Sequence, residues 1–282
     1  MRDLTGPQAR EGATIDDPVA RRRGSDPPRA IERRRPRPLA PARFRERLLS
    51  IMDRKNHWAW PAFGGPDISK AQLKIHFQHE FAIYVRDFPV LLTRIHGRNP
   101  PAAVRRMLAE NIYEEETGGL SFGKSHPDLF LVMMKGLGFA EAEFENIRLL
   151  PAACAYRAWL DRVTGQRDWV RAAATMAIFV EGSINDRHEI LHPAGPKAER
   201  EIEEVVRRHP LVRYHGLSPD CMDLTRAHQR VEAGHRHHAY AMVVAGAIGR
   251  RHQQAVIACV EKTLALWLRY RDAVARACDL DQ

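Results

Sequence analysis

Residues 69–91, SKAQLKIHFQHEFAIYVRDFPVL, form the stretch that decides the fold. Large apolar side chains recur in it every three or four residues, at Leu73, Phe77, Phe81, Tyr84, Phe88 and Leu91. This spacing follows the 3.6-residue turn of an α-helix, so the stretch predicts a long helix with one apolar stripe. The helix is expected to open at Asp67 or Ser69. Pro89 interrupts it, because proline lacks the backbone N–H that a helix interior uses.

Helical spacing continues almost everywhere from Pro41 onward. No run of alternating β-branched residues between hairpin turns competes with it. The other helices are expected over residues 100–119, 129–135, 140–148, 152–164, 169–191, 197–208, 219–247 and 250–279. The predicted fold is therefore all-α, a single bundle of seven main helices over residues 41–282.

The first 40 residues differ in composition from the rest of the chain. They hold ten Arg, six Asp or Glu, six Pro and no aromatic residue, so they carry about +4 of the formal charge of +9. Such a segment buries too little apolar surface to offset the entropy cost of ordering, which predicts a disordered basic extension over residues 1–40. Its arginine triplets could contact nucleic acid, but a solvated tail is the favoured interpretation.

Composition also excludes several classes of protein. The chain is 44% hydrophobic and 28% charged, as in ordinary globular proteins. Its longest apolar stretches, residues 172–180 and 239–248, are shorter than the roughly 20 residues that a membrane-spanning helix needs. The four cysteines lie far apart and no export signal opens the chain. We therefore expect a soluble, cytoplasmic protein without a membrane partner.

Glu181 directly follows the apolar run 172–180, in helical register with Ile178. A carboxylate on a buried face costs several kcal/mol to desolvate unless a cation compensates it. Glu181 is therefore either a ligand at an internal site or one partner of a salt bridge at the rim of the helix.

His228, Glu232 and His235 lie four and three residues apart on one predicted helix. At 100° per residue all three project from one face. A histidine and a carboxylate one turn apart are typical of the ligands that a helical bundle offers to a carboxylate-bridged metal pair. The alternative is an exposed, histidine-rich face with incidental salt bridges.

Three consecutive acids, Glu114–Glu116, end one predicted helix, and His126 opens the next. They cannot all face inward. Glu116 lies four residues after Ile112 and seven after Ala109, which favours Glu116; Glu115 is its rival and Glu114 ranks last. A solvated acidic helix end is the other interpretation. Glu80, at the edge of the first stripe, is a weaker candidate. Carboxylates and imidazoles without thiolates suit iron or manganese, with zinc as a further choice.

The order Glu116, His126-Pro127-x-Leu129-Phe130, Glu181 and His228-x3-Glu232-x2-His235 resembles the haem-oxygenase-like diiron oxidases and oxygenases. These are relatives of pyrroloquinoline-quinone synthase C and of thiaminase II (TenA-like) proteins. The resemblance covers residues 42–279 and implies a seven-helix haem-oxygenase-like fold that binds two iron ions. It implies that Glu116, His126 and His235 hold one iron and that Glu181, His228 and Glu232 hold the other, with Glu80 as an additional ligand.

The resemblance also implies an activity. Two Fe(II) ions would activate dioxygen, with an external reductant, to oxidise a small-molecule substrate. N-oxygenation of a small amine-containing metabolite in specialised metabolism is favoured; Tyr84, Tyr113 and Arg187 could orient the substrate. Relatives are commonly homodimers.

Three alternatives stay open. The first is diiron desaturation or C–C cleavage of an amino or fatty acid. The second is a metal-free oxidase like pyrroloquinoline-quinone synthase C. The third is a DNA-binding regulator that uses the basic tail, which would leave His228, Glu232 and His235 without a purpose; nucleic acid is not the expected partner.

Overall fold

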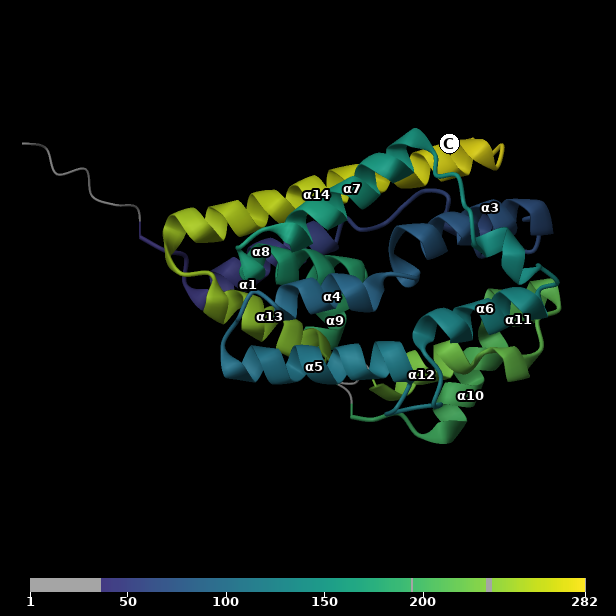
Figure 1. Ribbon diagram of the computed structural model, residues 1–282, viewed down its shortest axis with the longest axis horizontal. Helices are drawn as coiled ribbons and strands as arrows, with labels where there is room; N and C mark the ends of the chain where they lie inside the picture. Colours follow the sequence, from purple (N-terminus) through teal and green to yellow (C-terminus); the bar gives the residue numbers. More distant parts are fainter. Residues whose placement is uncertain (1–36, 194, 232–234, 282) are drawn as a thin grey trace, which may run out of the picture. The chain divides into compact units, whose positions relative to one another are not determined.

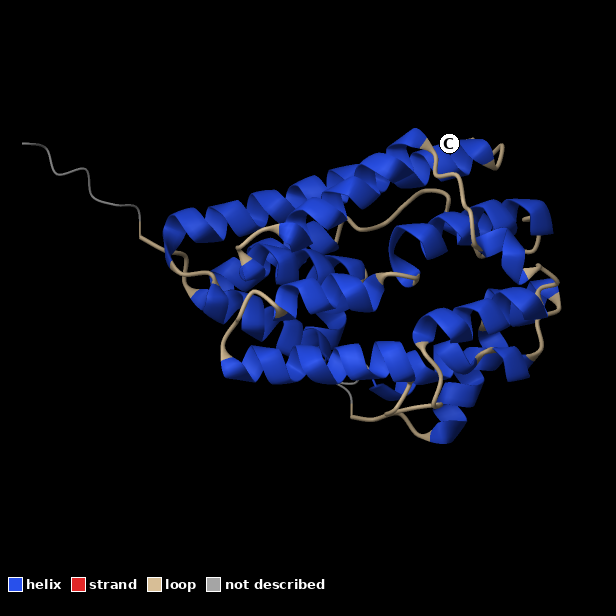
Figure 2. Cartoon of the chain, in the orientation of Figure 1, coloured by secondary structure: helices blue, strands red, loops and turns tan. Residues whose placement is uncertain are grey.

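The computed structural model describes residues 37–193, 195–231 and 235–281. Over these residues the chain is helical and contains no strand (Figure 2), which confirms the all-α prediction. Residues 1–36, which make up most of the predicted basic extension, lie outside the described residues, so that expectation stays a prediction.

The described chain forms more helices than the seven predicted. Its principal elements are α1 (Pro41–Met52), α3 (Lys70–Glu80), the π-helical turn η1 (Phe81–Val85), α4 (Phe88–His96), α5 (Ala102–Thr117), α6 (His126–Gly136), α7 (Pro151–Gly165), α8 (Trp169–Ala173), the π-helical turn η3 (Ala174–Val180), α9 (Asp186–Leu191), α10 (Glu199–Arg208), α11 (Pro210–His215), α12 (Asp223–Val231), α13 (His235–Gly246) and α14 (Gly249–Ala277). The short elements are α2 (Trp60–Phe63), η2 (Glu141–Phe144) and η4 (Pro219–Cys221).

The larger number of helices has local causes. The helix predicted over residues 169–191 breaks after Val180, and the one predicted over 140–148 reduces to the single turn η2. The predicted long helix is interrupted just before Pro89, because η1 ends at Val85 and α4 begins at Phe88. Pro89 lies in the first turn of α4, where its missing N–H removes no hydrogen bond. Ser69 opens α3 with a capping box, in which its side chain accepts from the Gln72 backbone and the Gln72 side chain accepts in return.

The long helix α14 organises the packing (Figure 1). It runs beside α7 and also contacts α1, α3 and η3. Tyr156 of α7 stacks on Tyr270 of α14, with ring centroids 5.7 Å apart and both side chains buried. On the other side of α7, α4 packs between α7 and α5. One continuous apolar core thus holds these helices in register.

A second set of contacts frames the candidate site. Helix α6 contacts α5, α12 and η1, and η3 lies against α13. These contacts bring together the end of α5, the start of α6, the middle of α12 and the ends of both π-helical turns. No helix in the described part of the chain has the length and apolar content to cross a membrane.

Candidate metal centre

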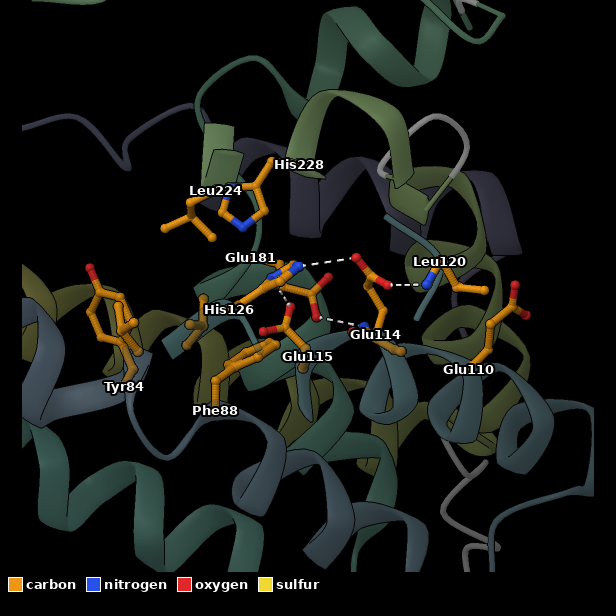
Figure 3. Close-up of a pocket in the computed structure, with 13 residues that line it drawn as sticks. Tyr84, Phe88, Glu110, Glu114, Glu115, Leu120, His126, Glu181, Leu224 and His228 are labelled. Atoms are coloured by element: carbon orange, nitrogen blue, oxygen red, sulfur yellow. Dashed lines mark hydrogen bonds and ion pairs between the residues drawn. The ribbon is translucent and has the colours of Figure 1, made fainter. Parts of the chain in front are cut away.

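A cavity of about 250 Å³ opens where α5, α6, α12 and the ends of η1 and η3 meet. Figure 3 shows its acidic and imidazole side chains converging from separate elements. They are Glu114, Glu115, His126, Glu181 and His228; Glu110 also lines the cavity, but it is exposed and its carboxylate points away from the others. The structure therefore places His126, Glu181 and His228, which are far apart in the sequence, in one cavity.

His126 lies at the start of α6 and is buried. Ser125 caps this helix by accepting from the Asp128 N–H. The His126 Nε2 atom lies 3.3 Å from Glu114 Oε1, and its Nδ1 atom lies 3.1 Å from Glu115 Oε1. The second contact is not aligned as a hydrogen bond, so the buried Nδ1 atom has no hydrogen-bond partner. A buried polar atom without one is costly and calls for an explanation.

The electrostatics of His126 follow from its neighbours. Burial alone lowers the pKa of an imidazole, because it disfavours the charged form. For His126 the nearby carboxylates of Glu115 and Glu114 outweigh burial, and together they raise its pKa above the ordinary value. The pocket therefore attracts positive charge at this ring.

Glu114 ties the loop after α5 to the site. Its carboxylate accepts from the Leu120 N–H at 2.7 Å and from the Ser121 hydroxyl. The loop can turn back because Gly118 ends α5 in the left-handed region, with φ at 60°. Spacing ranked Glu114 last of the three acids. The sequence feature that could have identified Glu114 is its position one helical turn before Gly118.

Glu115, and not Glu116, is the second acid that faces His126. Glu116 is exposed on the surface of α5. The expectation for Glu116 used Ala109 and Ile112 as markers of the buried face, but Ala109 is exposed and Ile112 is only half-buried. Glu116 lies 200° around the helix from the buried Glu114, so it points away from the cavity.

Glu181 follows the last residue of η3, and Asn111 and Arg236 are among the residues that hold it. Asn111 Nδ2 donates to Glu181 Oε1 at 3.1 Å, and Arg236 Nη2 donates to Glu181 Oε2 at 2.7 Å. Arg236 comes from α13 and is itself buried, so this pair lies inside the bundle and not at a helix rim. The attraction between the two charges offsets the free-energy cost of removing both from water. Nothing in the sequence pattern had singled out Arg236.

His228 projects from α12 toward His126, with ring centroids 5.0 Å apart and planes at 69°. Two ion pairs fasten α12 to α10: Arg226 to Glu203 at 2.6 Å and Arg230 to Glu199 at 2.8 Å. Helix α10 thus supports the helix that carries His228. Glu232 and the side chain of His235 lie outside the described residues.

Glu80 is not among the residues that line the cavity. Its carboxylate pairs with Arg271 of α14 and accepts from the Tyr84 hydroxyl at 2.8 Å. Burial raises the pKa of this carboxyl, but the charge of Arg271 outweighs it and holds the pKa at about 2. Tyr84 lines the cavity, so its phenol joins the site to this buried ion pair.

The two other proposed substrate contacts lie elsewhere. Tyr113 is exposed and covers Gly119. Arg187 forms ion pairs with Glu46 and Asp53 near α1. Neither side chain lines the cavity.

The residues of the cavity fit a metal of the iron group. Imidazole and carboxylate donors without thiolates suit iron, manganese or zinc, and the His126 Nδ1 atom is buried without a hydrogen bond. As arranged, no three histidine, cysteine, aspartate or glutamate side chains in the described ranges stand close enough to share one ion. Glu181 is instead turned to Arg236 and Asn111.

Comparison with known proteins agrees with this chemistry. Residues 75–268 match the family described as iron-containing redox enzyme. A stretch of 86 residues is 29% identical to a 4-aminobenzoate synthase of Chlamydia pneumoniae; it covers 30% of this chain and only 36% of that relative's length.

Two solved structures share the fold. One is a domain of unknown function with a haem-oxygenase-like fold from Shewanella denitrificans, with a TM-score of 0.61 and 16% identity over 86% of this chain and 94% of that one. The other is a TenA homologue from Pseudomonas syringae pv. tomato, with a TM-score of 0.54 and 12% identity over 83% and 89% of the two chains. At these identities they establish the haem-oxygenase-like fold alone.

Proposed function

This chain belongs to the family of iron-containing redox enzymes, and from that premise we propose that it is a non-haem diiron oxygenase acting on a small amine-containing metabolite. The observation that carries the proposal is the buried Nδ1 atom of His126, which has no hydrogen bond, faces Glu115 and lies across from the ring of His228.

The proposed ligands fall into two groups. Glu115 and His126 belong to one iron, together with His235; Glu181 and His228 belong to the other, together with Glu232. When bound, the iron pair supplies the electrons that reduce dioxygen, and an external reductant restores them. The assignment of Glu232 and His235 rests on their spacing in the sequence.

The remaining side chains of the cavity suit an amine. Val85, Phe88 and Leu224 give it apolar walls that limit the access of water. The exposed Glu110 is also among the lining residues, beyond the proposed ligands, and its negative charge attracts a protonated amine from solvent. The Tyr84 hydroxyl donates to Glu80, which leaves its oxygen free to accept a hydrogen bond from the substrate.

The test is anaerobic reconstitution with Fe(II), followed by metal counting and by stopped-flow absorption after oxygen is added. We expect two irons per chain and a transient visible band, both lost in His126→Ala and His228→Ala. The proposal is wrong if the protein binds no iron, or if the two variants bind as much iron as the wild type. Either result would favour the metal-free alternative.

The partial match to a 4-aminobenzoate synthase favours a second candidate, an iron-dependent oxidase whose product is an aromatic amine. In this test the iron-loaded protein is supplied with oxygen, reductant, an aromatic precursor that provides the ring and an amine donor that provides the nitrogen, and mass spectrometry would detect 4-aminobenzoate. Its formation by the wild type and its absence with Glu115→Gln would support this candidate over N-oxygenation.

A further inference from the structure

Glu181 occupies a point where a helix ends inside the protein. The turn η3 stops at Val180, and the backbone from Gly182 to Ile184 is not helical. A helix end leaves its last carbonyl groups without partners, and buried carbonyls without hydrogen bonds are costly. Something other than the helix must therefore satisfy the carbonyl groups on either side of Glu181.

Lys55, which follows α1, supplies those hydrogen bonds. Its Nζ atom donates to the carbonyl oxygens of Phe179 at 2.6 Å, Val180 at 3.2 Å and Gly182 at 2.5 Å. An ammonium has three donors and no acceptor, so these three carbonyls use all of them. The bonds bracket Glu181 in the sequence, two before it and one after it.

The rest of the Lys55 environment fixes this arrangement. Its ammonium lies 4.9 Å from the ring centroid of Phe179 and 5.8 Å from that of Trp267. Among the described residues, no carboxylate lies within ion-pair distance of it. The lysine therefore binds backbone carbonyl groups and aromatic faces; of the residues that it contacts, Val180 also lines the cavity.

The backbone after Glu181 is equally constrained. A Cβ atom at Gly182 would lie 2.2 Å from the Ile178 carbonyl oxygen and 2.5 Å from Asp186 Oδ2, so only glycine fits. Asp186 is buried and accepts from the Ser183 N–H at 2.7 Å and the Tyr240 hydroxyl at 2.9 Å. Gly182 and Asp186 thus fix the turn that follows Glu181. The position of the Glu181 backbone then depends on the hydrogen bonds that Lys55 makes to the neighbouring carbonyl groups.

We propose that Lys55 is a positioning residue that holds the backbone on both sides of Glu181 and so aims its carboxylate into the cavity for metal binding. The inference rests on the proposed function, in which Glu181 is an iron ligand. Residues that orient a metal ligand typically change metal affinity by about 10–100-fold when they are removed.

The first test needs no metal. In Lys55→Met, amide hydrogen exchange should rise over residues 174–185 and stay unchanged along α14. Lys55→Arg should restore most of the protection. Arg54→Met is the matched control, because Arg54 is the neighbouring cation but pairs with Glu261 at the surface. Unchanged exchange over residues 174–185 in Lys55→Met overturns the inference, whether or not the protein binds iron.

The second test counts Mn²⁺ by electron paramagnetic resonance, with thermal melting as the check on folding. We expect Lys55→Met to lower the affinity for one of two Mn²⁺ ions about 10–100-fold and to leave the affinity for the other unchanged. Lys55→Arg should restore part of the lost affinity. An equal loss of affinity for both Mn²⁺ ions in Lys55→Met would show that Lys55 only stabilises the fold, and it would overturn the inference. If the wild type binds no Mn²⁺ or Fe²⁺, the proposed function fails, and the amide exchange alone decides on Lys55.

Discussion

Arg271 of α14 binds the carboxylate of Glu80 of α3 inside the helical core, across 191 positions of sequence. The Arg271 side chain is 3% exposed and the Glu80 side chain 17%. The guanidinium also lies over the ring of Trp60, at 4.2 Å from its centroid. This pair, joined to the cavity by the Tyr84 hydroxyl, explains why an acid stands on an otherwise apolar stripe.

Removing the cation should destabilise the fold strongly. Arg271→Met leaves the Glu80 carboxylate buried without its charge partner, which typically costs 3–5 kcal/mol. Urea denaturation measures the free energy of unfolding. The exposed pair of Arg54 and Glu261 is the control, and Arg54→Met should cost less than about 1 kcal/mol. A loss below 1 kcal/mol in Arg271→Met would contradict the buried pair.

The same pair predicts a pH dependence of stability. The folded-state pKa of Glu80 is depressed to about 2, below its unfolded value near 4.5. The unfolded state therefore takes up a proton first as the pH falls, and about 3 kcal/mol of stability is lost between pH 4.5 and pH 2. The double variant Glu80→Met/Arg271→Met lacks this titration. The unfolding free energy of the wild type minus that of the double variant should therefore fall by that amount between pH 4.5 and pH 2. A pH-independent difference would rule out this pKa.

The acid that faces His126 can be identified by substitution. Glu115→Gln should weaken iron binding at least about tenfold, because an amide is a poorer ligand for a hard cation than a carboxylate. Glu116→Gln should bind iron like the wild type, since Glu116 is exposed on α5. Metal counting after anaerobic reconstitution and desalting compares the two. If Glu116→Gln bound less iron than Glu115→Gln, Glu116 would be the ligand.

The loop after α5 should depend on its glycine. Gly118 has φ at 60°, and a Cβ atom there would lie 2.1 Å from the Lys124 carbonyl oxygen. Gly118→Ala should therefore cost about 2–3 kcal/mol through backbone strain and displacement of the loop. Gly123→Ala is the control, because Gly123 also has a positive φ but no atom within 4 Å of the added methyl. Thermal unfolding measures both; equal losses would show that the contact with Lys124 is unimportant.

The spacing of apolar residues predicted the all-α class because a helical stripe is a local property, readable wherever one face is buried. The same spacing could not locate the ends of the helices near the site. The turns η1 and η3 are π-helical, and they shift the faces of the residues at and after their ends, such as Val85 at the end of η1 and Glu181 directly after η3.

Choosing among neighbouring acids failed for a related reason. Glu115 and Glu116 differ by 100° around one helix, and the choice depends on which face α6 covers. Ala109 and Ile112 marked the wrong face, because a small or half-buried apolar residue carries little information on burial.

By itself the sequence determined the helical class, the resemblance to the haem-oxygenase-like proteins and the supply of imidazoles and carboxylates, because residue type and spacing are local. Only the tertiary structure decided which charges meet. Arg236 reaches Glu181 and Arg271 reaches Glu80 from helices distant in sequence, and Lys55 reaches the end of η3. The cost of burying a charge depends on partners that the packing of helices supplies, and no sequence period encodes that packing.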